Sequence, residues 1–119
     1  MDIINRDDCE PFITKDTSEI REIMAYRNSS CESMSLAEAT IYPDRSTEAH
    51  YHEESDEIYY FLSGSGHMRL GEKEIDVGPG DAVYIPPGTV HQTWNTGPEK
   101  LVILCICVPP YEHEDTELV

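Results

Sequence analysis

The sequence has few basic residues, with 8 Lys and Arg against 24 Asp and Glu in a chain of 119 residues. The resulting formal net charge of -16 argues against partners that carry phosphate groups, so we expect neither nucleic acid nor a membrane surface to bind. The sequence also has no run of about 18 apolar residues that could cross a bilayer. A basic start followed by a long apolar segment, typical of a secretory signal, is absent as well, and we therefore expect a cytoplasmic protein.

Several catalytic motifs are also absent. The sequence has no G-x-S-x-G nucleophile motif, no phosphate-binding glycine loop and no dinucleotide fingerprint, and its "SGSGH" segment is typical of a hairpin turn. Only four cysteines occur, and without a secretory signal we expect them to remain thiols. Two of them, Cys105 and Cys107, share one face of the apolar segment "LVILCICV", which favours core packing over soft-metal binding.

The distribution of apolar residues predicts an all-β domain. Residues 34–110 contain short runs rich in Val, Ile, Tyr and Leu, separated by Gly, Pro, Asn and Asp. Such a series without intervening helices is typical of an antiparallel sandwich or a small barrel. The flanks are expected to form an N-terminal arm over residues 1–33 and an acidic tail over residues 111–119. Within the arm, Asp16 followed by Glu19 is typical of a helix cap and predicts a short helix over residues 17–24.

Histidines and a glutamate recur at the ends of the predicted strands. His50 and His52 lie two residues apart, so both project to the same face of a strand. Glu57 shares parity with two aromatic residues of the next strand, and a hairpin through "PPGT" returns His91 toward the same interior. Three imidazoles and one carboxylate suit manganese, iron, nickel or zinc better than calcium or magnesium. We therefore expect His50, His52, Glu57 and His91 to bind one divalent transition metal ion.

A simpler alternative exists for the same residues. The histidines could be packed core residues, and the acidic residues around Glu57, namely Glu53, Glu54 and Asp56, could form a solvated loop. However, burying three imidazoles and a carboxylate without a cation would carry a large desolvation cost, whereas a divalent ion satisfies all four groups. The metal site is therefore the preferred interpretation.

The spacing of these residues resembles two conserved motifs of the cupin superfamily, in particular of its small single-domain, cupin-2 type. The motifs are His50-x-His52-x4-Glu57-x6-Gly64 and Gly80-x5-Pro86-x-Gly88-x2-His91-x3-Asn95. One position departs from the family pattern, because Asp44 stands where the family has a glycine six residues before the first histidine. The resemblance implies a small antiparallel jelly-roll β-barrel with one mononuclear metal ion, and it implies a homodimer.

Other side chains near the motifs have weaker assignments. Four are expected to line the barrel: Tyr59, Phe61, Met68 and Tyr84. Only Tyr59 and Tyr84 among them can donate a proton, so these two are candidate catalytic residues, with packing as the alternative role. His67 is expected at the surface and His113 in the acidic tail, where a solvated histidine is commoner than a ligand.

Four protein ligands leave two positions of an octahedral ion for a small-molecule substrate. The first hypothesis is an isomerase, decarboxylase or lyase acting on a small organic acid or sugar-like compound. The second is a metal-dependent dioxygenase, and the third is a binding module without turnover. Only Arg27, Arg45 and Arg69 offer cations near the motifs, and this scarcity weakens the case for a phosphorylated sugar.

Overall fold

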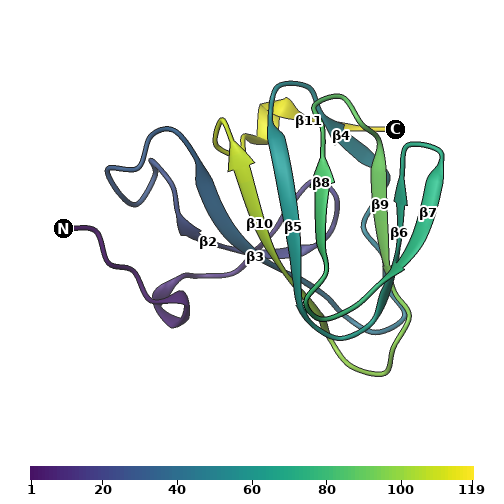
Figure 1. Ribbon diagram of the computed structural model, residues 1–119. Coiled ribbons are helices and arrows are strands. Elements are labelled where there is room, and N and C mark those ends of the chain that lie inside the picture. The colour runs from purple at the N-terminus through teal and green to yellow at the C-terminus, as the bar shows by residue number, and fades with distance from the viewer.

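Antiparallel strands make up nearly all of the regular structure in a computed structural model that describes residues 1–119 (Figure 1). The strands are β1 (Phe12–Ile13), β2 (Glu19–Met24), β3 (Ser35–Ile41), β4 (His50–His52), β5 (Asp56–Ser63), β6 (Gly66–Leu70), β7 (Lys73–Val77), β8 (Ala82–Ile85), β9 (His91–Asn95), β10 (Leu101–Val108) and β11 (Thr116–Leu118). Two short 3-10 turns, η1 (Arg6–Asp8) and η2 (His113–Asp115), are the only helical segments. No helix has the length and hydropathy needed to cross a membrane.

The strands form two facing sheets, and the chain is a small antiparallel jelly-roll barrel, as expected. One sheet has six strands in the order β1-β2-β3-β10-β5-β8, and the other has five in the order β11-β4-β9-β6-β7 (Figure 1). Both ends of the chain take part in these sheets. The strands β1 and β2 extend the first sheet beyond β3, and β11 pairs with β4 at the edge of the second.

The core lies between the two sheets and follows from strict alternation along the central strands. On β5, Glu57, Tyr59 and Phe61 are buried and the residues between them are exposed, which is the period of two that a strand imposes. Full burial of an apolar side chain the size of Phe61 stabilises the fold by about 1.5–3 kcal/mol. On β10 the inward face includes Cys105 and Cys107, both buried free thiols, which confirms the predicted packing role.

The predicted helix over residues 17–24 is wrong, because residues Glu19–Met24 form strand β2. This strand pairs with β3, and its register shifts between Glu22 and Met24. The extra residue at this bulge breaks the alternation of a strand, so Ile20, Ile23 and Met24 acquire the spacing of a helical face. An isolated helix of eight residues is also marginal in water, whereas pairing with β3 satisfies the backbone groups of the segment.

Two motif positions fix turns rather than chemistry. Asp44 adopts a φ of 64°, in the left-handed region that the family's glycine would occupy without strain. Aspartate tolerates this conformation better than most residues, so the departure from the family pattern leaves the turn intact. Asn95 donates through Nδ2 to the carbonyl oxygens of Ile41 and Glu99, at 2.9 and 2.7 Å, and so ties the end of β9 to the neighbouring loop.

Candidate metal centre

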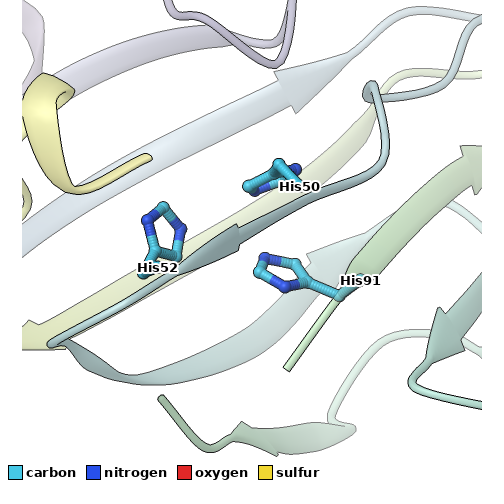
Figure 2. Close-up of side chains that lie close together, drawn as sticks. All are labelled: His50, His52 and His91. Atoms are coloured by element: carbon cyan, nitrogen blue, oxygen red, sulfur yellow. The ribbon is translucent and has the colours of Figure 1, made fainter. Parts of the chain in front are cut away.

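Three histidine side chains converge between strands β4 and β9 (Figure 2). His50 and His52 project from the same face of β4, and His50 lies opposite His91 in the pairing of β4 with β9. One ring nitrogen of each histidine lies within 4.8 Å of the corresponding atom of the other two. All three are buried, with His91 fully inaccessible. The strand pairing therefore brings together residues 39 to 41 positions apart in the sequence, and this group could bind a metal ion.

The hydrogen bonds of each ring select its tautomer. His50 Nδ1 lies 2.7 Å from the carbonyl oxygen of Glu48, and His91 Nδ1 lies 3.0 Å from that of Thr89, so both Nδ1 atoms must donate. His52 Nδ1 lies 3.2 Å from Thr116 Oγ1. Donation at Nδ1 leaves each Nε2 with a free lone pair, which is the form that metal-binding histidines adopt.

The hydroxyl of Thr116 is itself fixed by its neighbours. It donates to the carbonyl oxygen of Glu112 at 3.1 Å, so its oxygen is left to accept from His52. Thr116 is 1% exposed and belongs to β11, close to the end of the chain. A C-terminal strand therefore orients a histidine that lies more than sixty residues earlier in the sequence.

Glu57 completes the group from the opposite sheet. Its Oε1 lies 3.3 Å from His52 Nε2 and 3.6 Å from His91 Nε2, and its Oε2 accepts from Cys107 Sγ at 3.3 Å. Neither Glu57 Oε1 nor His91 Nε2 has a hydrogen-bond partner, although both are buried. Buried polar atoms without partners are costly, and these two face one another with their lone pairs, which only a cation or proton can bridge. This donor set therefore fits a divalent transition metal ion.

The pKa values agree with an electrostatic coupling inside this group. Burial lowers the pKa of His91 to about 4, and nearby His50 adds to the effect, so His91 is neutral at physiological pH. Burial also disfavours a charged His52, but the carboxylate of Glu57 at 3.3 Å outweighs this effect and raises the pKa of His52. Conversely, burial favours protonated Glu57, but His52 and His91 hold the pKa of this carboxyl below its usual value.

The two tyrosines proposed as catalytic residues lie in different places. Tyr59 is buried in the interior, and its ring centroid lies 5.8 Å from that of His91. Burial raises the pKa of the Tyr59 hydroxyl well above its usual value, so this group is a neutral donor. Tyr84 is 55% exposed and hydrogen-bonded to Asp56, so the expectation that it lines the barrel is wrong. In β8 it is Ile85, paired with Glu57, that faces inward.

The remaining expectations concern residues outside the histidine group. Phe61 and Met68 are fully buried in the core, as expected for barrel lining. His67 lies on β6 away from the group, with its two ring nitrogens 2.8 Å from Asp76 and 2.9 Å from Glu74. His113 is exposed in η2. Neither histidine belongs to the group of potential ligands.

Sequence reasoning missed one acidic residue of the site. Asp16, which the pattern assigns to a helix cap, is 8% exposed, and its Oδ2 lies 3.3 Å from His50 Nε2. The sequence carries one usable signal, because Asp16 is flanked by Thr14 and Ser18, hydroxyl residues typical of a turn that binds a carboxylate. Its distance of 34 residues from His50 gives no indication that the two side chains meet.

A cavity adjoins the histidine group. Its 19 lining residues include His50, His52, Glu57, Tyr59 and Asp16, but no Lys or Arg. The cavity is small, with a volume of about 40 Å³.

Comparison with known proteins agrees with the geometry. A family model described as "Cupin domain" matches residues 37–107. The sequence is 45% identical over 113 residues to the uncharacterized protein MJ1618 of Methanocaldococcus jannaschii, a match that covers 95% of this chain and 90% of that protein.

Two further similarities concern proteins with named activities. The chain is 42% identical over 86 residues to glucose-6-phosphate isomerase of Thermococcus gammatolerans, covering 61% of this chain and 46% of that enzyme. It thus spans about half the length of the glucose-6-phosphate isomerases that it matches. Among solved structures, the polyketide cyclase RemF from Streptomyces resistomycificus superimposes with a TM-score of 0.84, over 100% of this chain and 85% of that one. At 24% identity this likeness shows the fold alone.

Proposed function

Because the chain belongs to the cupin family, we propose that it is an enzyme that holds one divalent transition metal ion, manganese, iron, nickel or zinc, through His50, His52, Glu57 and His91. Its substrate is a small polar compound, sugar-like or an organic acid, and the reaction is of the isomerase, decarboxylase or lyase type. The observation that carries this proposal is the buried pair of unpartnered atoms, Glu57 Oε1 and His91 Nε2, beside two further imidazoles.

The sequence similarity to glucose-6-phosphate isomerases favours an isomerase among these reaction types. A hydroxy-carbonyl compound can chelate a divalent ion through adjacent oxygens, and the ion when bound supplies Lewis-acid polarisation of the carbonyl. The residues of the chain provide the surroundings. The three imidazoles and Glu57 fix the position of the ion, and Tyr59 offers a neutral hydroxyl beside His91.

The barrel wall contributes water exclusion. Ile41, Tyr59 and Ile103 line the cavity and are almost completely buried. Apolar side chains beside the histidines keep the local dielectric low, which would strengthen the interaction of a bound ion with a chelating ligand. Tyr84, on the outer face of β8, has no part in this proposal.

The experiment that tests the proposal is elemental analysis of the natively purified protein, followed by a substrate panel with and without dioxygen. We expect about one transition metal ion per chain, and turnover of a hydroxy-carbonyl or hydroxy-acid compound that proceeds equally well under anaerobic conditions. A requirement for dioxygen would select the dioxygenase hypothesis instead. Retained metal with ligand binding but no turnover would select the non-catalytic binding module.

A further inference from the structure

The carboxylate of Asp16 is held in one orientation by the segment that joins β1 to β2. Its Oδ1 accepts three hydrogen bonds, from Thr14 Oγ1 at 2.6 Å, Ser18 N at 2.9 Å and Ser18 Oγ at 2.6 Å. The following residue, Thr17, has a φ of 76°, and the carbonyl oxygen of Asp16 accepts from Glu48 N at 2.7 Å. The turn is therefore anchored to the segment that precedes the two histidines of β4.

The second carboxylate oxygen has no such partners. Asp16 lines the cavity, and its Oδ2 lies 3.3 Å from His50 Nε2. Three donors saturate Oδ1, so Oδ2 is the oxygen that can accept a hydrogen bond from a ligand in the cavity. An ionised acceptor of this kind forms strong hydrogen bonds with hydroxyl groups.

The charge around the cavity disfavours an anionic ligand. Three carboxylates, those of Asp16, Glu22 and Glu57, are in the lining, and no Lys or Arg is. Arg27 neutralises Glu22, and the other two carboxylates balance the charge of one divalent ion. A carboxylate or phosphate ligand would therefore add an uncompensated negative charge to a buried site. Arg27 lies outside, where its guanidinium binds Glu22 Oε1 at 2.7 Å and Glu112 Oε2 at 3.3 Å.

We propose that Asp16 is a substrate-binding residue whose Oδ2 accepts a hydrogen bond from a hydroxyl group, and that the site selects small uncharged hydroxy-carbonyl or polyol ligands over organic acids and phosphate esters. The small enclosed volume agrees with a ligand of a few carbon atoms. This inference rests on the proposed function, because it places the ligand beside the metal site, and it narrows the substrate class that the proposal left open.

The test compares two probes of similar size, dihydroxyacetone, which is uncharged, and glycolate, which is anionic. Their dissociation constants are measured by isothermal titration calorimetry on the natively purified protein. Both probes carry a hydroxyl group, but only glycolate adds an uncompensated negative charge to the buried site. We therefore expect the wild type to bind dihydroxyacetone at least about tenfold more tightly. A wild type that binds glycolate as tightly as dihydroxyacetone would overturn the inference without any variant being needed.

The variant Asp16→Asn sharpens the test. The three donors around Oδ1 keep the amide oxygen of asparagine in that place, so its NH2 group faces the cavity. The substitution thus exchanges an anionic acceptor for a neutral donor. We expect the ratio of the two dissociation constants to shift by at least about tenfold in favour of glycolate. The control Asp56→Asn removes the same charge from the exposed outer face of β5 and should keep the wild-type preference.

Metal content separates this inference from the proposed function. Asp16→Asn should retain the metal of the wild type, because the ligand set is complete without Asp16. Loss of metal from this variant would make Asp16 a metal ligand and overturn its assignment as a substrate-binding residue. If Asp16→Asn retained its metal and still preferred dihydroxyacetone to glycolate as the wild type does, that assignment would also be overturned. The proposed function is tested separately, by the metal content and the turnover of the wild type.

Discussion

His52 Nδ1 and Thr116 Oγ1 lie 3.2 Å apart and join the first histidine strand to the last strand of the chain. Replacing Thr116 by valine removes the only acceptor of the His52 Nδ1 proton at nearly constant volume. Loss of a partner that orients a metal-binding histidine costs about 10–100-fold in metal affinity. We therefore expect Thr116→Val to weaken metal binding by that factor, as measured by competition with a chelator of known affinity.

The control for this variant is Thr96→Val, a substitution of the same type at an exposed position after β9. It should leave metal affinity unchanged. Wild-type affinity in Thr116→Val would show that the hydroxyl does not orient His52 toward an ion.

The histidines themselves allow a more direct test. His91→Ala removes one proposed ligand and should yield protein without stoichiometric metal. A ligand present at about 100 times its dissociation constant stabilises a fold by about 2.7 kcal/mol, so added metal should raise the Tm of the wild type by several degrees and leave that of the variant unchanged. Elemental analysis and thermal denaturation with and without metal measure both effects.

His67→Ala is the matched control, because His67 lies on the five-stranded sheet but outside the histidine group. It should keep the metal content and the metal-dependent rise in Tm. If His91→Ala retained its metal, the ligand assignment would be wrong.

The parts of the site that could be predicted from the sequence are those set by short-range geometry. His50 and His52 share a face because strand side chains alternate, and Glu57 is buried because it alternates with Tyr59 and Phe61. The spacing of the second motif then predicts that His91 belongs to the same site, although a long stretch of chain separates it from β4.

The parts of the site that could not be predicted depend on pairing between strands far apart in the sequence, or on a strand that is apolar on both faces. Asp16 and Thr116 reach the site only because β2 pairs with β3 and β11 with β4, and no local period reports these pairings. The prediction for Tyr84 fails because "AVYI" is apolar on both faces of a strand, so alternation alone does not decide which face turns inward. The partner residue Glu57 decides it, by pairing with Ile85.

The surface histidine gives a prediction of pH dependence that is independent of the metal site. Hydrogen bonds to Asp76 and then Glu74 raise the pKa of His67 above 6.5. Because the folded-state pKa is the higher one, protonation favours the folded protein. The contribution of His67 to the free energy of unfolding is complete below pH 6.5. It is lost as the pH rises through the pKa of His67 in the folded protein. It is small, since the group is solvated.

NMR titration of the histidine ring signals measures this pKa. Asp76→Asn should lower the pKa of His67 toward 6.5, because it removes the carboxylate with the largest effect. A value at or below 6.5 in the wild type would contradict the ion pairs seen across β6 and β7.

Gly64, the last position of the first motif, lies where the chain turns from β5 to β6 with a φ of 88°. A Cβ atom there would stand 2.5 Å from the carbonyl oxygen of Lys100 and 2.9 Å from Leu101 Cα, both backbone atoms that cannot move without displacing β10. Gly80 has a similar φ of 90°, but a Cβ atom added to it would meet only open space.

Alanine at either site carries the strain of positive φ, of the order of 1–3 kcal/mol, and only Gly64→Ala adds the clash. We expect Gly64→Ala to lower the free energy of unfolding by more than Gly80→Ala does, as measured by urea denaturation. Equal losses in the two variants would mean that the backbone conformation alone, and not the contact with β10, requires glycine at position 64.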